Sequence, residues 1–247
     1  MLAQKLLRRE YLPRCAMLWR CSRTDSRVVC VRRSAYGDSS REQLVTADDI
    51  GTTGRLRKQL ALIVEADRLK RVLRRTVITD SSRHENSAEH SWHLALAAMT
   101  LAEHAGRGVD IARVMRMVVV HDLVEIDAGD TFAYDAAANL GRVEREKLAA
   151  DRLFGLLPSA QGDEMRALWD EFEEGRSETS RFAIALDRLQ PLLLNDAANG
   201  GSWHTHGVTR SQVLRRMAPI ESAIPAAWPL VLEIVERNCA SGHIAAD

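Results

Sequence analysis

Residues 118–130 read VVVHDLVEIDAGD, and this stretch decides how the whole chain is interpreted. It begins as an apolar run typical of a buried helix, and then places His121 and Asp122 in its middle. Glu125 follows four residues after His121, a spacing that puts both side chains on one face of a helix. Burying these groups without partners is costly because each loses its hydration. A divalent cation would compensate them, since neutral imidazole and carboxylates are common metal ligands.

Two further segments supply the donors that a closed metal site needs. The segment NSAEHSWH (86–93) carries His90, and the segment RFAIALDRLQPLLL (181–194) carries Asp187 as a single acid among apolar residues. Together with His121 and Asp122, they offer two imidazoles and two carboxylates from three helices. Mixed nitrogen and oxygen ligation predicts one divalent ion. The ligand types do not decide whether this ion is Mn, Co, Fe, Ni or Zn.

The apolar spacing along most of the chain predicts helices, and the sequence has neither βαβ alternation nor a glycine-rich phosphate loop. Asp110 is a candidate N-cap and Gly129 lies close to a helix stop, while Ser87 is a candidate N-cap of an earlier helix. We therefore expect an all-α fold, a compact helical bundle. The expected helices cover 46–75, 87–105, 110–129, 141–156, 161–174, 177–198, 209–217 and 226–240.

Composition narrows the possible partners and the compartment. The 247 residues contain 34 basic and 34 acidic side chains, so we expect neither nucleic acid nor a membrane surface as a partner. No apolar stretch approaches the ~20 residues of a membrane-spanning helix. The four cysteines form no CxxC pair, which argues against a zinc ribbon or a disulfide framework. The expected location is the cytoplasm.

Residues 1–47 differ from the rest, because they contain ten Lys and Arg residues but only four Asp and Glu residues. We interpret them as a basic, disordered extension that precedes a catalytic domain at 48–247. Organellar targeting by this Arg-rich segment is the alternative. It lacks the continuous apolar core of a secretory signal.

The three separated segments resemble the HD-domain phosphohydrolases, whose motif is H…HD…D. The resemblance covers roughly residues 55–200. More narrowly, HDxxExxxGD at 121–130 is similar to the branch that contains bacterial 5′-deoxynucleotidases and their eukaryotic relatives. Bacterial members often have Trp after the Arg upstream of the first His, whereas this sequence has Thr76 after Arg74 and Arg75.

The resemblance implies a role for each matching residue. Glu125 would transfer protons, Asp130 would face the sugar, and either Arg74 or Arg75 would contact the phosphate. It also implies a homo-oligomer, with a dimer as the expectation. The metal ligands that it implies are His90, His121, Asp122 and Asp187.

The function expected from these residues is a metal-dependent phosphohydrolase that releases phosphate from (deoxy)nucleoside 5′-monophosphates by metal-activated water. One alternative is an HD hydrolase of another small phosphate or nucleotide. A second is a non-catalytic, metal-binding regulatory module, against which the retention of Glu125 and Asp130 argues.

Other polar residues in these segments have simpler interpretations. His93 is expected to pack or to support a neighbouring ligand, and His84 to lie in a loop that borders the site. Asp127 is expected at the surface or in a cap. The pair His204 and His206 is expected in a solvated loop near the pocket.

Overall fold

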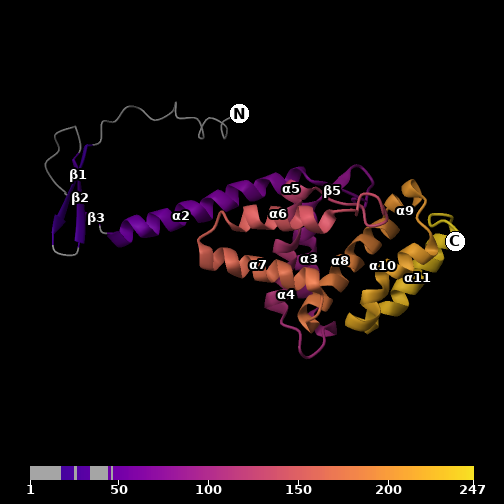
Figure 1. Cartoon of the computed structure of the whole chain (residues 1–247). Coiled ribbons are helices and arrows are strands. Elements are labelled where there is room, and N and C mark those ends of the chain that lie inside the picture. The colour runs from indigo at the N-terminus through magenta and orange to yellow at the C-terminus, as the bar shows by residue number, and fades with distance from the viewer. Residues whose placement is uncertain (1–17, 25–26, 34–43, 46) are drawn as a thin grey trace. The chain divides into compact units, whose positions relative to one another are not determined.

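The structure is a computed structural model that describes residues 18–24, 27–33, 44–45 and 47–247 (Figure 1). The chain divides into two compact units, Met1–Lys58 and Gln59–Asp247. In the first unit, β1 (Leu18–Thr24), β2 (Arg27–Arg33) and β3 (Leu44–Val45) form an antiparallel sheet in that order. The remainder of the predicted disordered extension, 1–47, lies outside the described residues, so the domain boundary at 47/48 stays a prediction.

The second unit is helical, which confirms the predicted fold class. No helix in the described ranges has the length and apolar character needed to cross a bilayer. The helix that leads into this unit is α2 (Ala47–Ala66). The helices that follow are α3 (Ser87–Thr100), α4 (Ile111–Val120), α5 (Glu125–Ala128), α6 (Arg142–Phe154), α7 (Ser159–Glu174), α8 (Glu178–Ala197), α9 (Gly201–His206), α10 (Arg210–Ala223) and α11 (Trp228–Ala240).

Helix α8 lies at the centre of this unit, where it packs against α3, α4, α7 and α10 (Figure 1). Phe182, Leu186 and Leu192 of this helix are fully buried. They meet buried residues such as Leu94 of α3 and Met117 of α4 in one continuous core. Each such side chain contributes about 1.5–3 kcal/mol of hydrophobic free energy. This core fixes the positions of α3, α4 and α8, the three elements that lead to the candidate site.

The helix starts follow local hydrogen bonding. Asp110 caps α4 as predicted, because its side chain accepts a hydrogen bond from the backbone N–H of Arg113. Helix α3 begins one residue away from the expectation. Asn86, not Ser87, is its N-cap and forms a reciprocal capping box with Glu89. Ser87 is thereby free to use its hydroxyl elsewhere.

The helical pattern over 46–75 is correct only in its first part. After Ala66 the chain makes a 3-10 turn, Asp67–Arg71, and then enters β4 (Leu73–Val77), which pairs antiparallel with β5 (His84–Asn86). Thr76, Val77 and Ile78 are β-branched, and such residues favour the pleated strand over the helix. Arg74 and Arg75 therefore lie on a strand, where successive side chains point to opposite faces.

Candidate metal centre

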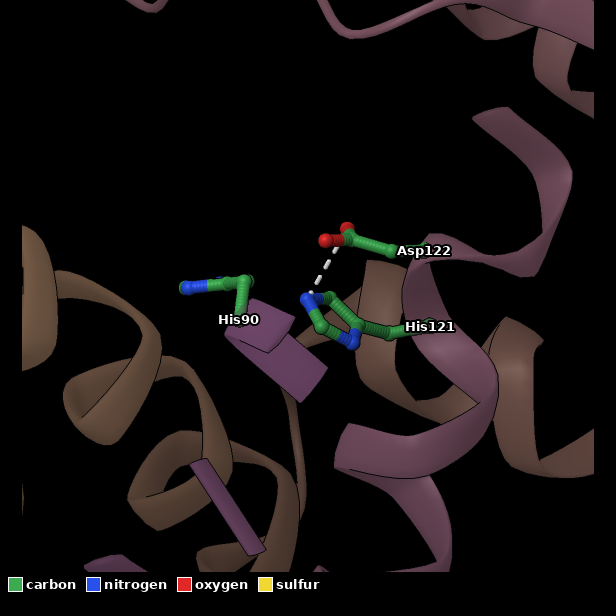
Figure 2. A group of neighbouring side chains, drawn as sticks. All are labelled: His90, His121 and Asp122. Carbon is green, nitrogen blue, oxygen red and sulfur yellow. Dashed lines mark ion pairs between the residues drawn. The ribbon is translucent and has the colours of Figure 1, made fainter. Parts of the chain in front are cut away.

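Three elements bring four polar side chains together inside the helical unit. Helix α3 contributes His90, the 3-10 turn His121–Val124 contributes His121 and Asp122, and α8 contributes Asp187. All four side chains are buried. His90, His121 and Asp122 each offer one possible ligand atom, and these atoms lie within 4.8 Å of one another. Figure 2 shows the three side chains, with the ion pair between His121 and Asp122 dashed.

Asp187 joins this group through the two imidazoles. Its Oδ1 lies 2.9 Å from Nε2 of His90 and 3.8 Å from Nε2 of His121. On the other side, Nε2 of His121 lies 2.9 Å from Oδ1 of Asp122 (Figure 2). The structure thus brings together the four residues that the sequence predicted as ligands.

Both imidazoles have their Nδ1 atoms occupied by acceptors. Nδ1 of His121 lies 2.9 Å from the carbonyl oxygen of Val118, and Nδ1 of His90 lies 2.9 Å from Oε1 of Gln190. Because those oxygens can only accept, each Nδ1 carries its hydrogen, and each ring directs Nε2 toward the cluster, where this atom offers a lone pair when the ring is neutral. This is the orientation that a metal-ligating histidine needs.

The buried cluster also needs a positive charge. Nε2 of His121 is buried and, within the described part of the chain, has no hydrogen-bond partner of good geometry. Burial alone would lower the pKa of His121, but the charges of Asp122 and Asp187 outweigh it and raise this pKa to about 10. A proton on His121 thus balances the carboxylates when no cation does. The donor set fits a divalent metal, which would take over that charge.

The same balance keeps both carboxyls ionised. Burial would raise the pKa of Asp122, but His121 and Arg74 lower it to about 2. The pKa of Asp187 is well below its usual value, because Arg188 and the two imidazoles outweigh its burial. Ionised carboxylates and lone-pair imidazoles are the species that bind a divalent cation.

The turn that carries His121 differs from the predicted continuous helix over 110–129. Helix α4 ends at Val120, and the next four residues tighten into a 3-10 turn before α5. Side chains three apart eclipse in such a turn, so Asp122 rather than His121 shares a face with Glu125. The helix stops at Gly129, as predicted, with φ 75° and ψ 154°.

Glu125 is buried beside this cluster, and its Oε2 accepts a hydrogen bond of 2.6 Å from Oγ of Ser87. Burial, and next the charge of Asp122, raise its pKa well above the usual value, although Arg74 opposes them. The carboxyl therefore holds its proton more firmly than an ordinary glutamate does. Sequence analysis missed Ser87 as the partner, because the pairing links segments 38 residues apart.

Arg74 lies among carboxylates, whereas Arg75 is exposed at the rim of the same pocket. Nη1 of Arg74 donates to Oδ2 of Asp122 at 2.9 Å and lies 3.8 Å from Asp130. Its Nε lies 3.6 Å from Oε2 of Glu85. These charges outweigh the burial of Arg74 and raise its pKa, which keeps the guanidinium cationic.

Glu85 and Gln190 were missed by the sequence analysis. Nε2 of Gln190 donates to Oε1 of Glu85 at 2.6 Å. This hydrogen bond orients the amide of Gln190, whose Oε1 accepts the hydrogen bond from Nδ1 of His90. Burial raises the pKa of Glu85 to about 7. Gln190 lies three residues after Asp187 on α8, so helical spacing was a usable signal for it. No sequence pattern separates Glu85 from Glu89.

The remaining predicted residues lie around this centre. His93 supports it as expected, because its Nδ1 contacts Nε2 of Gln190 at 3.1 Å. His84 is exposed but begins β5 instead of lying in a loop. Asp127 is exposed and pairs with Arg152. His204 and His206 are exposed but belong to α9, so the loop expected there was wrong.

A cavity of about 270 Å³ opens beside the cluster. Its walls include Phe132, Tyr134 and Trp203, with the rings of Phe132 and Tyr134 5.3 Å apart in an edge-to-face arrangement. Both basic and acidic side chains line the same space. The lining arginines are Arg74, Arg75, Arg142, Arg188 and Arg216.

Fold and donor set together define a helical domain built around a buried H…HD…D cluster. The family model for the HD domain matches residues 66–228, and the chain belongs to this family. A solved structure from Magnetospirillum magnetotacticum, described as a predicted metal-dependent phosphohydrolase, is 49% identical with a TM-score of 0.74. The match covers 77% of this chain and 98% of that one.

More distant relatives are proteins named 5′-deoxynucleotidase HDDC2. The Danio rerio protein is 29% identical over 126 residues, which are 51% of this chain and 62% of the relative. The human protein is also 29% identical over 126 residues, with 51% and 60% covered. This chain therefore aligns with about three fifths of the length of these relatives.

Proposed function

We propose that this protein is a metal-dependent phosphohydrolase that releases phosphate from (deoxy)nucleoside 5′-monophosphates. The observation that carries the proposal is the convergence of the Nε2 atoms of His90 and His121 with the carboxylates of Asp122 and Asp187. A divalent ion held there would activate water and neutralise charge on a phosphate oxygen. Similarity to the 5′-deoxynucleotidases supports the choice of substrate.

Glu125 is the proposed proton-transfer residue. Its carboxyl is buried at the cavity wall, has a raised pKa and is oriented by the hydroxyl of Ser87. A protonated acid in that position can donate its proton to the leaving alkoxide. The ion pairs of Arg74 with Asp122 and Asp130 hold the neighbouring carboxylates in place.

The aromatic residues of the cavity wall would receive the nucleoside. Phe132 and Tyr134 line the cavity, and both rings are only partly buried, so they can offer apolar surface to a base. Trp203 also lines the cavity but is almost fully buried. The cavity volume, about 270 Å³, is close to the lower end of small-ligand pockets, about 300–1,000 Å³. Asp130 lines the same cavity and remains the proposed contact to the sugar.

The test is a substrate panel with purified, metal-free protein to which one divalent metal at a time is added. Phosphate release from nucleoside 5′-monophosphates, compared in ribo and deoxy forms, is the expected result. Release only from triphosphates or from non-nucleotide esters would favour the other enzyme hypothesis. Metal binding without any release would favour the regulatory module.

The homo-oligomer and the cytoplasmic location stay predictions. One feature supports self-association: Trp92, Leu96 and Met99 share one face of α3 and are 66%, 44% and 60% exposed. Light scattering of the purified chain tests it, and a monomer at micromolar concentration would contradict it.

A further inference from the structure

Two of the arginines that line the cavity, Arg75 and Arg216, make no ion pair among the residues that the structure describes; Arg75 is exposed, whereas Arg216 is partly buried. Arg74 donates to Asp122 and Arg142 donates to both oxygens of Glu146 at 2.9 Å, so carboxylates already hold these two guanidinium groups. Arg188 pairs with Asp187. Among the lining arginines, Arg216 thus combines partial burial with the lack of an ion pair in the described part of the chain.

Arg216 and Arg188 lie on two helices in contact, α10 and α8. Burial, and next the positive charge of Arg188, lower the pKa of Arg216 to about 10. Arg216 is therefore still cationic at neutral pH, and it faces a like charge in a poorly hydrated place. Such a pair is unfavourable unless an anion comes between its members.

The position of Arg188 links this pair to the candidate metal centre. Arg188 follows Asp187 directly and also pairs with it, so the guanidinium lies at the edge of the cluster. A phosphate that enters the cavity beside the cluster has both arginines in the walls around it. The planar guanidinium fork suits phosphate oxygens, to which it donates two parallel hydrogen bonds.

We propose that Arg188 and Arg216 form the anion-binding subsite that holds the phosphate group of the substrate. This deepens the proposed function and rests on it. Arg74 then acts as a positioning residue, because its donors are engaged by Asp122 and lie near Asp130 and Glu85. In this arrangement the phosphate binds from the side of α8 and α10.

The test measures binding of inorganic phosphate to the full-length, Mn-loaded protein by isothermal titration calorimetry. Arg216→Gln should weaken phosphate binding at least tenfold, and Arg216→Lys should recover part of the loss because it keeps the charge. Arg215→Gln is the matched control, since Arg215 is the neighbouring, exposed residue on α10. Metal content, measured on the same samples, should stay that of the unchanged protein.

Equal phosphate affinities in Arg216→Gln and Arg215→Gln would overturn the proposal, as would a lack of saturable phosphate binding by the unchanged protein. If Arg216→Gln fails to fold, Arg216→Met, which has a similar length and no charge, takes its place. Phosphate binding is measured without turnover. If the protein binds phosphate through this subsite but hydrolyses no phosphate ester, the proposed function is wrong and the subsite stands.

Discussion

Nε2 of His90 lies 2.9 Å from Oδ1 of Asp187, although 97 positions of sequence separate the two residues. Their contact depends on the packing of α3 against α8, whose apolar side chains form the core of the unit. The candidate centre is thus assembled by tertiary structure, and only His121 and Asp122 come from one local segment. Changes to single donors test it directly.

We expect His121→Ala and Asp187→Asn each to lose bound metal together with phosphate release. Each change removes a donor atom from a buried cluster in which the remaining groups were arranged around a positive charge. Elemental analysis and an activity assay on the same preparation are the measurements. His204→Ala, at an exposed histidine, is the control. Full metal occupancy in either variant would remove that residue from the proposed ligands.

Glu125→Gln is expected to keep its metal and to lower kcat by about 10²–10⁴-fold, the range of a general acid or base. The amide has nearly the same shape but holds no transferable proton. Asp127→Asn, two residues further and exposed, is the matched control. Loss of metal would make Glu125 a ligand instead, and near-normal kcat with full metal would end the proton-transfer hypothesis.

Gln190→Leu is expected to weaken metal binding by about 10–100-fold, the usual effect of removing a group that orients a ligating histidine. The change removes the acceptor of the Nδ1 hydrogen of His90 and leaves Glu85 without its donor. Competition with a fluorescent chelator measures the affinity. Gln161→Leu, outside the cavity, should leave it unchanged; equal affinities in the two variants would contradict the role of Gln190.

Metal binding should release protons and strengthen as pH rises. The pKa of His121 is raised to about 10 without metal, so its imidazole is protonated at pH 7 and must lose that proton to ligate. Below about pH 10, each step to higher pH reduces competition by this proton. Calorimetry in buffers of different ionisation enthalpy counts the released protons. Binding enthalpies independent of the buffer would contradict this.

A chain that lacks residues 1–47 is expected to fold and to retain phosphate release. Every candidate site residue lies in the unit Gln59–Asp247, and so does the described core. Thermal unfolding and kcat/KM, compared with the full chain, are the measurements. A truncated protein that is folded but inactive would show that the extension contributes to the site.

The sequence predicted the donors better than it predicted their surroundings. His121 and Asp187 stand out because each is a polar residue in an apolar helical pattern, and the helices themselves follow from that pattern. The β4–β5 pairing could not be predicted, since a run rich in Leu, Arg and Val suits a helix until Asn86 and its neighbours pair with it. The role of Glu85 was missed for the same reason.

The backbone of Gly129, at φ 75° and ψ 154°, occupies a region that is essentially reserved for glycine. A side chain there would meet no neighbouring atom within 4 Å, so the restriction comes from the backbone alone. The glycine ends α5, and Asp130, the next residue, lies 3.8 Å from Arg74. Residue 129 therefore carries no chemistry, yet it limits which sequences can form the site. Consider a homologue or a designed chain that keeps all the charged residues but has a branched residue at position 129. Its backbone would take another course there, and the aspartate at position 130 would no longer lie beside Arg74.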